Sequence, residues 1–311
     1  MTGGLSKIFD SLNVVLQSAE VRENFRPVRF SDVVMPSNVL IHLNHGVYYS
    51  EEDSLPMEEG SFYFRPSGSL MNLRIGEGPK YLTFEGENGF PTLEERHEFQ
   101  RVLNPFEEPP AKPEVFTYIV FEVLLHNTFP LFKLLQLPRI PLPKDIELNY
   151  LVMEMCRESW DKRLGRERIL KNYTEEIVIR ICRYISSLSR YHKNLDKISF
   201  LSDKRLTAII DYIRDNIGGD LSNKQLAKIS FLSEDYIGQF FKNLTNQSLQ
   251  DYVENQRLET AMYKLNATAD SVSEIAFSVG FKDPAYFSRR FKMKYQVNAN
   301  TIRNAKSTFQ E

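Results

Sequence analysis

The amino-acid sequence predicts an α+β protein with a β-rich N-terminal part and an entirely helical C-terminal part. The chain has 311 residues, which exceeds a typical single domain and makes two domains the expectation. Residues 25–118 mix β-branched and aromatic residues with Gly, Pro, Ser and Asn, which is typical of strands joined by turns. From residue 203 onward, apolar residues recur at helical spacing. We therefore expect a first domain over residues 1–191, a linker over 192–202 and a second domain over 203–311.

The composition excludes several broad classes of protein. With 42% hydrophobic and 12% aromatic residues, the chain can form real cores, which excludes wholesale disorder. The net charge of −2 indicates no particular partner. From residue 203 onward, 15 Lys and Arg stand against 13 Asp and Glu, so any nucleic-acid site must depend on how the charges are arranged. Only two cysteines occur, and no apolar run approaches the roughly 18 residues of a membrane span, so we expect a soluble, unsecreted, cytoplasmic protein.

The N-terminal part is expected to contain several short strands. The segments VVMPSNVLIHLNHGVYYS, GSFYFRPSGSLMNLRIG and PKYLTFEG fit strands separated by turn residues, which suggests an antiparallel sandwich or barrel. Residues 104–113 predict a loop. The run VFTYIVFEVLL at residues 115–125 predicts a buried strand, with a helix as the alternative.

Two helices are expected next, after a loop PRIPLPKD, over residues 146–159 and 166–191. The second carries an apolar stripe at helical spacing, made of Ile177, Ile181, Tyr184, Ile185 and Leu188. This stripe has two interpretations, packing on the strand domain or an interface between two copies of the chain, and both can hold if two such helices pair.

The C-terminal part is expected to consist of helices separated by short turns. The predicted helices are 203–217, 223–230, 234–244, 249–265, 272–279, 284–294 and a short one near 300–305. Residues suited to capping precede five of them: Ser222, Ser233, Ser248, Ser271 and Asp283.

An internal repeat lies within these helices. LAKISFLSEDYIGQFFK begins at residue 226 and IAFSVGFKDPAYFSRRFK at residue 275, and each predicts a short helix, a tight turn and a longer helix. Gly280 provides a turn residue that can take positive φ. Phe240 and Phe241 in the first copy, and Phe287 and Phe291 in the second, are expected to pack inward. The pattern is that of two helix-turn-helix units.

Helix-turn-helix geometry indicates a DNA contact surface. Asp235, Gln239 and Lys242 share a face of the first longer helix, and Ala285, Arg289 and Lys292 share the matching face of the second. Arg reads guanine through two hydrogen bonds and Gln reads adenine, while Ser at a helix start and Lys hold phosphates. The alternative for the basic residues is a solvated helix face; they are Lys282, Arg289, Arg290, Lys292 and Lys294. Two copies joined by a long helix favour DNA, because such a helix can hold two recognition helices about one DNA turn, roughly 34 Å, apart.

This C-terminal region resembles the DNA-binding domain of the AraC/XylS family of bacterial transcription regulators. The resemblance covers about 100 residues and rests on LAKISFLSEDYIGQFFK, RLETAMYKL and VSEIAFSVGFKDPAYFSRRFK. It implies double-stranded DNA as the partner. The positions it assigns to the groove are Asp235, Tyr236 and Gln239 in the first unit, and Ala285, Tyr286 and Arg289 in the second. The full set of predicted DNA-binding residues is Ser233, Asp235, Tyr236, Gln239, Lys242, Lys282, Ala285, Tyr286, Arg289, Arg290 and Lys292.

The sequence departs from the family pattern in three places. Gln296, Asn298 and Ala299 stand where the family usually has Gly, Thr and Pro, and Phe231 stands in the turn of the first unit where a small or polar residue is usual. Glu234 and Asp235 also place negative charge at the start of the first recognition helix, which suits the helix dipole but repels phosphate. We therefore expect the second unit to do more of the binding and the first to discriminate by contact or repulsion. The alternative is that the first unit touches DNA weakly.

The resemblance also implies an N-terminal cupin-like antiparallel β-barrel with dimerisation helices, which would sense a small molecule. The candidate effector-pocket residues are His42, Phe62, Phe64, Arg65, Leu73, Arg74, Ile75 and Leu82, and ordinary core packing is the alternative for the apolar ones. Metal chemistry is not expected, because His42 and His45 are three apart and a strand would point them to opposite faces. No GxSxG motif of a nucleophilic serine and no phosphate-binding GxxxxGK[ST] motif occurs. No cofactor is expected.

Three functions remain open from the sequence. The first is a sequence-specific, dimeric regulator with a small-molecule effector, acting as an activator and contacting RNA polymerase by family resemblance. The second is such a regulator without an effector, controlled by a protein partner or by its abundance. The third is an enzyme with an appended DNA-binding module, which would need a reactive cysteine, yet Cys156 and Cys182 both lie in helical patterns that favour packing.

Overall fold

The computed structural model describes residues 12–50, 56–108, 114–126, 129–196, 198, 200, 203–245 and 247–307. The chain divides into two compact units, Met1–Ser199 and Phe200–Glu311. This division falls inside the predicted linker, 192–202. In that stretch the chain forms a short helix, α6 (His192–Asp196), directly after a 3-10 turn, η1 (Ser189–Tyr191).

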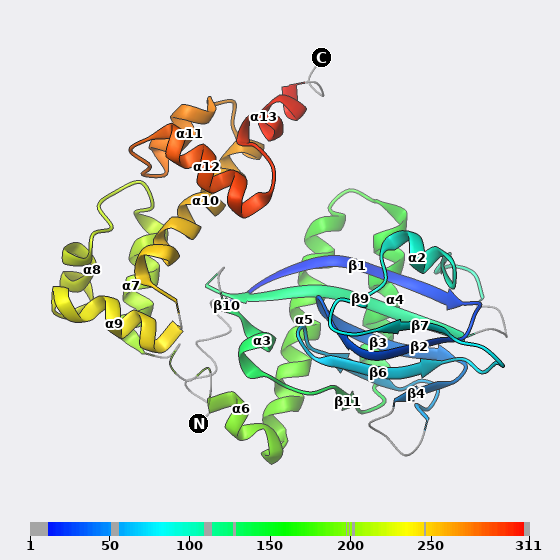
Figure 1. The fold of residues 1–311 in the computed structure, drawn as a ribbon. Helices are drawn as coiled ribbons and strands as arrows, with labels where there is room; N and C mark the ends of the chain where they lie inside the picture. Colours follow the sequence, from blue (N-terminus) through cyan, green and yellow to red (C-terminus); the bar gives the residue numbers. More distant parts are fainter. Residues whose placement is uncertain are drawn as a thin grey trace. The chain divides into compact units, whose positions relative to one another are not determined.

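The described part of the N-terminal unit contains two β-sheets (Figure 1). The larger sheet has the strand order β11-β5-β3-β9-β1-β8, and β10 pairs with β9. Its strands are β1 (Leu12–Asn24), β3 (Asn38–His45), β5 (Phe62–Arg65), β8 (Gln100–Leu103), β9 (Glu114–Leu125), β10 (Phe129–Pro130) and β11 (Ile140–Leu142). The smaller sheet has the order β4-β6-β2-β7, with β2 (Val28–Val34), β4 (Tyr48–Ser50), β6 (Leu70–Ile75) and β7 (Leu82–Glu85).

The predicted closed barrel is not confirmed. Over the described residues, no strand of the larger sheet pairs with a strand of the smaller one, so the architecture is a two-sheet sandwich. The two sheets share a core in which Phe30 and Leu73 of the smaller sheet join Ile41 and Phe116 of the larger one. The pairing is also not wholly antiparallel, because β2 and β7 run parallel.

Period two in the strands gives the larger sheet two buried faces. Phe116, Tyr118 and Val120 of β9 belong to the core between the sheets. The alternate residues Thr117, Ile119 and Phe121 are fully buried on the other face. Helices α4 (Ile146–Asp161) and α5 (Arg166–Ser187) pack on that face, against β1 (Figure 1).

The apolar stripe of α5 packs within its own unit. Ile177, Ile181 and Ile185 are buried, while Tyr184 and Leu188 are partly exposed. The packing interpretation is therefore confirmed for these three isoleucines, and the stripe gives no support to a dimer interface on the same face.

Several elements of the N-terminal unit were not predicted. The 13-residue strand β1 pairs with β9 along its whole length. The predicted loop PRIPLPKD contains β11, whose three residues pair with β5, so a loop was the wrong prediction there. Two five-residue helices, α2 (Leu93–His97) and α3 (Leu131–Leu135), were also missed. Each of these short elements depends on its neighbours in space, which local patterns do not reveal.

The C-terminal unit is helical, as predicted. Its helices are α7 (Lys204–Asp215), α8 (Asn223–Ser230), α9 (Glu234–Thr245), α10 (Leu249–Ala267), α11 (Val272–Ser278), α12 (Pro284–Tyr295) and α13 (Ala299–Ser307). The side chains of four predicted caps accept backbone N–H groups at helix starts: Ser222, Ser248, Ser271 and Asp283. Capping satisfies donors that have no partner inside the helix, and it explains why these boundaries could be read from the sequence.

Candidate nucleic-acid interface

The internal repeat folds as two helix-turn-helix units. In the first, α8 is followed by a three-residue turn and α9; in the second, α11 is followed by a longer turn and α12. The four predicted inward residues, Phe240, Phe241, Phe287 and Phe291, are buried. Each longer helix therefore presents its opposite face to solvent, as DNA contact through the major groove requires.

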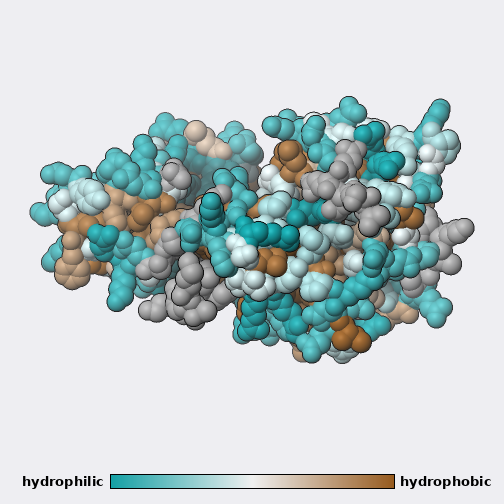
Figure 2. Space-filling model, turned by 90° about the horizontal axis from the view of Figure 1, so that it is seen from below, coloured by the Kyte–Doolittle hydropathy of each residue, from teal (hydrophilic) through white to brown (hydrophobic). Residues whose placement is uncertain are grey.

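Both turns contain a residue with positive φ, but the type of residue differs between them. Gly280 has φ +93°, and a Cβ there would lie 2.7 Å from the Arg257 guanidinium, so glycine suits both the conformation and the close approach. In the first unit Phe231 takes φ +55°, a left-handed conformation that is costly for a bulky residue. Its side chain is 94% exposed, and apolar surface is visible on the lobe of α8 and α9, at the left of Figure 2.

The first recognition helix, α9, exposes the residues that the sequence assigned to DNA. Ser233, Asp235, Tyr236, Gln239 and Lys242 are all exposed. The Gln239 side chain donates a hydrogen bond to the Asn243 side chain one turn further on. Glu234 and Asp235 occupy the first turn of the helix, so a carboxylate pair faces any phosphate that approaches this end.

The second recognition helix, α12, is more basic and its cations divide into two groups. Lys282, Ala285, Tyr286, Arg289 and Lys292 are exposed. Within the described part of the chain, neither Arg289 nor Lys292 forms an ion pair, so both can meet an external anion.

The other cations of α12 are held by the long helix α10. Arg290 is only partly exposed and forms an ion pair with Glu254. The Tyr286 hydroxyl donates to the same carboxylate at 2.6 Å, and this hydrogen bond raises the pKa of Tyr286. Lys294 pairs with Glu259 of α10 at 2.9 Å. These contacts fix α12 on α10, so Arg290 is placed to orient the recognition helix.

Helix α10 also bonds to the loop that precedes the first unit. Arg257 donates hydrogen bonds to the backbone oxygens of Ile217 and Gly219, each at 3.2 Å, in the loop between α7 and α8. Its 19 residues give α10 a length of about 28 Å. The sequence did not identify these contacts of Glu254 and Arg257, because their partners are 36 and about 40 residues away and no local pattern links them.

The predicted effector-pocket residues do not lie together. Leu73, Ile75 and Leu82 belong to the core between the sheets. Arg65 is fully buried, and its guanidinium donates to the Tyr48 hydroxyl at 3.2 Å and to the backbone oxygen of Leu70.

The other four predicted pocket residues lie elsewhere. Arg74 is partly exposed and its guanidinium lies over the Tyr49 ring at 4.9 Å. Phe64 contacts Phe121 and Phe132 on the helix-covered face of the larger sheet. His42 and Phe62 are stacked on that same face, with ring centroids 4.3 Å apart. The set is therefore distributed over three layers of the unit.

Over the residues that the structure describes, no cluster of three or more His, Cys, Asp or Glu side chains could hold a metal ion. No helix in the same ranges combines the length and the apolar character needed to cross a bilayer.

Comparison with known proteins bears on the helix-turn-helix units. Residues 226–305 match the family described as a helix-turn-helix domain. The transcriptional regulatory protein YesN of Bacillus subtilis is 43% identical over 91 residues, which are 28% of this chain and 25% of that protein. The HTH-type transcriptional activator RhaS of Mannheimia succiniciproducens is 30% identical over 95 residues, which are 30% of this chain and 35% of that protein.

A solved structure matches the same region. The C-terminal domain of the two-component response regulator yesN from Fusobacterium nucleatum is 31% identical, with a TM-score of 0.29, and the match covers 30% of this chain and 93% of that one. The chain spans about a quarter of the Bacillus relative's length and about a third of the Mannheimia relative's length. The matched residues run from α8 to α13 and include both units. The C-terminal unit of this chain is therefore a helix-turn-helix domain of the AraC type.

Proposed function

We propose that this chain is a sequence-specific transcription regulator that binds double-stranded DNA through both helix-turn-helix units. The observation that supports this most is the pairing of two exposed recognition helices on one long helix, α10, with Arg289 and Lys292 exposed on the second. An unpaired arginine on a recognition helix suits guanine, and the lysine three residues later suits a backbone phosphate. Because DNA is the target, we propose a cytoplasmic site of action.

The two units are expected to contribute unequally. The exposed face of α12 carries cations, whereas α9 begins with two carboxylates, Glu234 and Asp235. Affinity therefore comes mainly from the second unit, and the first unit adds discrimination by contact or repulsion.

The experiment that tests this function is selection from random DNA duplexes by the full-length chain, followed by fluorescence anisotropy at several salt concentrations. We expect a motif of two blocks whose centres lie about one helical turn apart, with affinity that falls steeply as salt rises. A selected motif with a single short block would show that the first unit does not read bases. A folded protein that binds no duplex at any salt concentration would contradict the proposal.

The N-terminal unit is proposed to dimerise, through a surface other than the stripe on α5. Large apolar side chains on and just after α4 are exposed: Tyr150 by 69%, Trp160 by 47% and Leu164 completely. All three belong to one segment of the sequence, residues 150–164, and large apolar side chains that are exposed along one segment suit a protein contact. Sedimentation of the Leu164→Lys variant should give a smaller species than the wild-type chain, and an unchanged mass would move the dimer contact elsewhere.

The finer features of the regulator are also proposals. By resemblance we propose an activator that contacts RNA polymerase, with a small-molecule effector or, alternatively, with control by a protein partner. An enzyme with an appended DNA-binding module has less support, because burial raises the pKa of both Cys156 and Cys182 to about 12. Thiols with such pKa values are neutral at physiological pH and are poor nucleophiles.

A further inference from the structure

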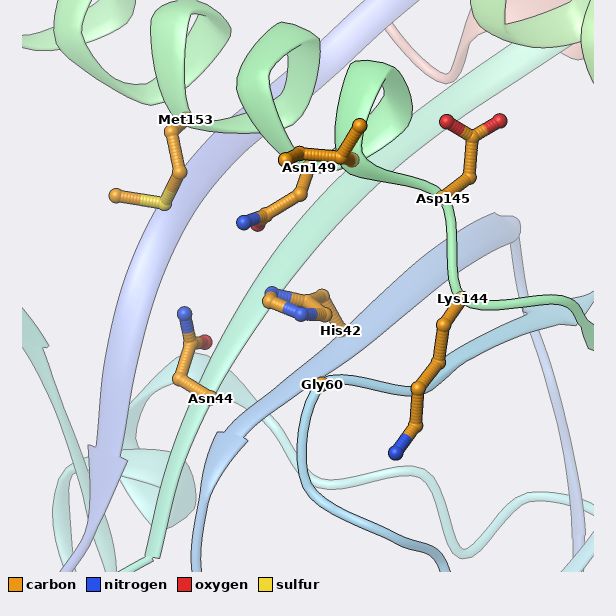
Figure 3. Close-up of a pocket in the computed structure, with 8 residues that line it drawn as sticks. His42, Asn44, Gly60, Lys144, Asp145, Asn149 and Met153 are labelled. Atoms are coloured by element: carbon orange, nitrogen blue, oxygen red, sulfur yellow. The ribbon is translucent and has the colours of Figure 1, made fainter.

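An open pocket lies in the N-terminal unit between strand β3 and the start of helix α4 (Figure 3). Its volume is about 700 Å³, which is in the range of small-molecule sites. The lining residues are His42, Asn44, Gly60, Lys144, Asp145, Ile146, Asn149 and Met153. It occupies the helix-covered face of the larger sheet, outside the core between the sheets.

Two buried polar atoms in this lining have no hydrogen-bond partner. They are Nδ1 of His42 and Oδ1 of Asn149. His42 is 5% exposed, and Figure 3 shows its ring turned toward the helix from which Asn149 descends. Buried polar atoms nearly always have partners, so two such atoms lining one pocket indicate a ligand that supplies them.

The imidazole of His42 is neutral and offers an acceptor. Burial lowers the pKa of His42 to about 4, although its interaction with the Gly60 backbone opposes this shift. Since Nδ1 has no partner, the Gly60 interaction belongs to the other ring nitrogen, and a neutral ring that donates there keeps the Nδ1 lone pair free to accept. Both orphan atoms are therefore acceptors.

The third polar group in the lining is the amide of Asn44. Its oxygen accepts a hydrogen bond from the Thr117 hydroxyl at 2.8 Å, so its NH₂ group is the end left for a ligand. Met153 contributes an apolar surface, and its sulfur lies 3.9 Å from the same hydroxyl.

The charged residues of the lining are already engaged. Lys144 pairs with Glu58 at 3.0 Å, and Asp145 caps α4 by accepting the N–H groups of Glu147 and Leu148. An anionic or cationic ligand would thus find no free counter-ion among the described lining residues, and transfer of its charge from water would cost free energy.

We propose that this pocket binds a small uncharged polyhydroxy compound, whose hydroxyl groups donate to His42 Nδ1 and Asn149 Oδ1 and accept from the Asn44 amide. A hydroxyl group both donates and accepts, so adjacent hydroxyls match this combination. The binding stands on the geometry alone, whereas its role as an effector site rests on the proposed function.

Nuclear magnetic resonance of the full-length chain with ¹⁵N-labelled histidine tests the binding directly. The probes are D-glucose and myo-inositol, with gluconate as the charged counterpart that keeps most of the hydroxyl groups. We expect the two uncharged probes, and not gluconate, to shift the His42 Nδ1 signal to saturation. No shift with either uncharged probe, or an equal shift with gluconate, would overturn the proposal.

Two variants of α4 make the test specific. Asn149→Ala removes one acceptor and preserves a good helix-forming residue, and it should weaken binding of the uncharged probes about tenfold. Ser159→Ala lies on the same helix outside the lining and serves as the matched control, with affinity unchanged. Equal affinity in both variants would show that the probes bind elsewhere and would contradict the site.

The failure of this inference can be told apart from failure of the proposed function. DNA binding is measured by anisotropy on the same protein without any probe. If the chain binds DNA but none of the probes, only the ligand-binding proposal is contradicted. A chain that binds the probes but no duplex retains the pocket and loses its role as a regulator.

Discussion

Glu254 of α10 accepts a hydrogen bond from the guanidinium of Arg290 on α12 in an ion pair. The two residues are 36 positions apart, and the carboxylate also accepts the Tyr286 hydroxyl. One carboxylate on the linking helix thus sets the orientation of the second recognition helix. Arg290, which the sequence assigned to DNA, is engaged within the protein, and we propose that the exposed Arg289 beside it reads a base.

Glu254→Gln is expected to reduce sequence discrimination. The amide cannot hold the Arg290 guanidinium as an ion pair, so α12 gains freedom on α10 and presents Arg289 less uniformly. Stability should fall by about 1 kcal/mol, because the pair is partly exposed to solvent. The measurement is the ratio of affinities for the selected duplex and a scrambled duplex.

A matched variant of α10 separates orientation from charge. Glu259→Gln removes a carboxylate that pairs with Lys294, which is not among the predicted base readers. If both variants lower discrimination equally, the effect comes from loss of negative charge and the positioning role of Glu254 is wrong.

Arg289→Ala is expected to relax the preference at one base of the selected motif. Loss of a two-pronged contact to guanine costs about 1–3 kcal/mol of binding free energy on the cognate site. Lys292→Ala is the control on the same exposed face, and it should weaken all duplexes alike and reduce the salt dependence by about one phosphate contact. Anisotropy with single-base variants of the duplex distinguishes the two, and wild-type behaviour of Arg289→Ala would remove α12 from base recognition.

Phe231→Gly is expected to stabilise the protein. The residue has φ +55° and an almost fully exposed side chain, so glycine relieves a left-handed conformation at little cost in burial. The free energy of unfolding should rise by about 1 kcal/mol in a urea titration. Gln296→Gly, at φ +58°, should behave in the same way, and it restores the glycine that the family resemblance places there. A lower midpoint for either variant would show that its side chain makes contacts that outweigh the strain.

The stability of the chain is expected to depend on His42 below neutral pH. The folded state holds the pKa of His42 at about 4, below the ordinary value of 6.5, because the ring is buried. As the pH falls through 6.5, the unfolded chain binds a proton at His42 that the folded chain does not bind. The contribution of His42 to the free energy of unfolding is therefore complete above pH 6.5 and declines toward pH 4. Between about pH 7 and about pH 5, the free energy of unfolding should fall by about 2 kcal/mol for this reason. Urea titrations at both pH values should show that His42→Gln loses less stability than the wild-type chain, and equal losses would mean that His42 titrates normally.

The helices of the C-terminal unit could be predicted because their signals are local. Ser222, Ser248, Ser271 and Asp283 cap helix starts with their own side chains, and the buried phenylalanines recur at helical spacing. The turn at Gly280 follows from the same local chemistry. These features depend only on residues that are close together in the chain, so the sequence alone is enough to predict them.

The candidate site could be predicted in part. The sequence identified the exposed faces of α9 and α12. In α12, for example, the helical repeat places Phe287 and Phe291 on one face and Arg289 on the opposite face. It could not separate Arg289 from Arg290, since the carboxylate that engages Arg290 belongs to α10. Adjacent arginines on one helix look alike until the opposite surface is known.

In the N-terminal unit, the sequence by itself determined that strands form and that α5 has one apolar face. Only the tertiary structure decided which sheet each strand joined and which face of it each side chain took. His42 and Leu73 were both expected to line one cavity, but His42 faces the helices and Leu73 faces the opposite sheet. The physical reason is that alternation along a strand assigns side chains to two faces but does not indicate which element packs on each face. Here both faces of the larger sheet are buried, so hydrophobicity does not distinguish them. Burial is a property of the assembled layers, and it requires residues far apart in the chain to meet.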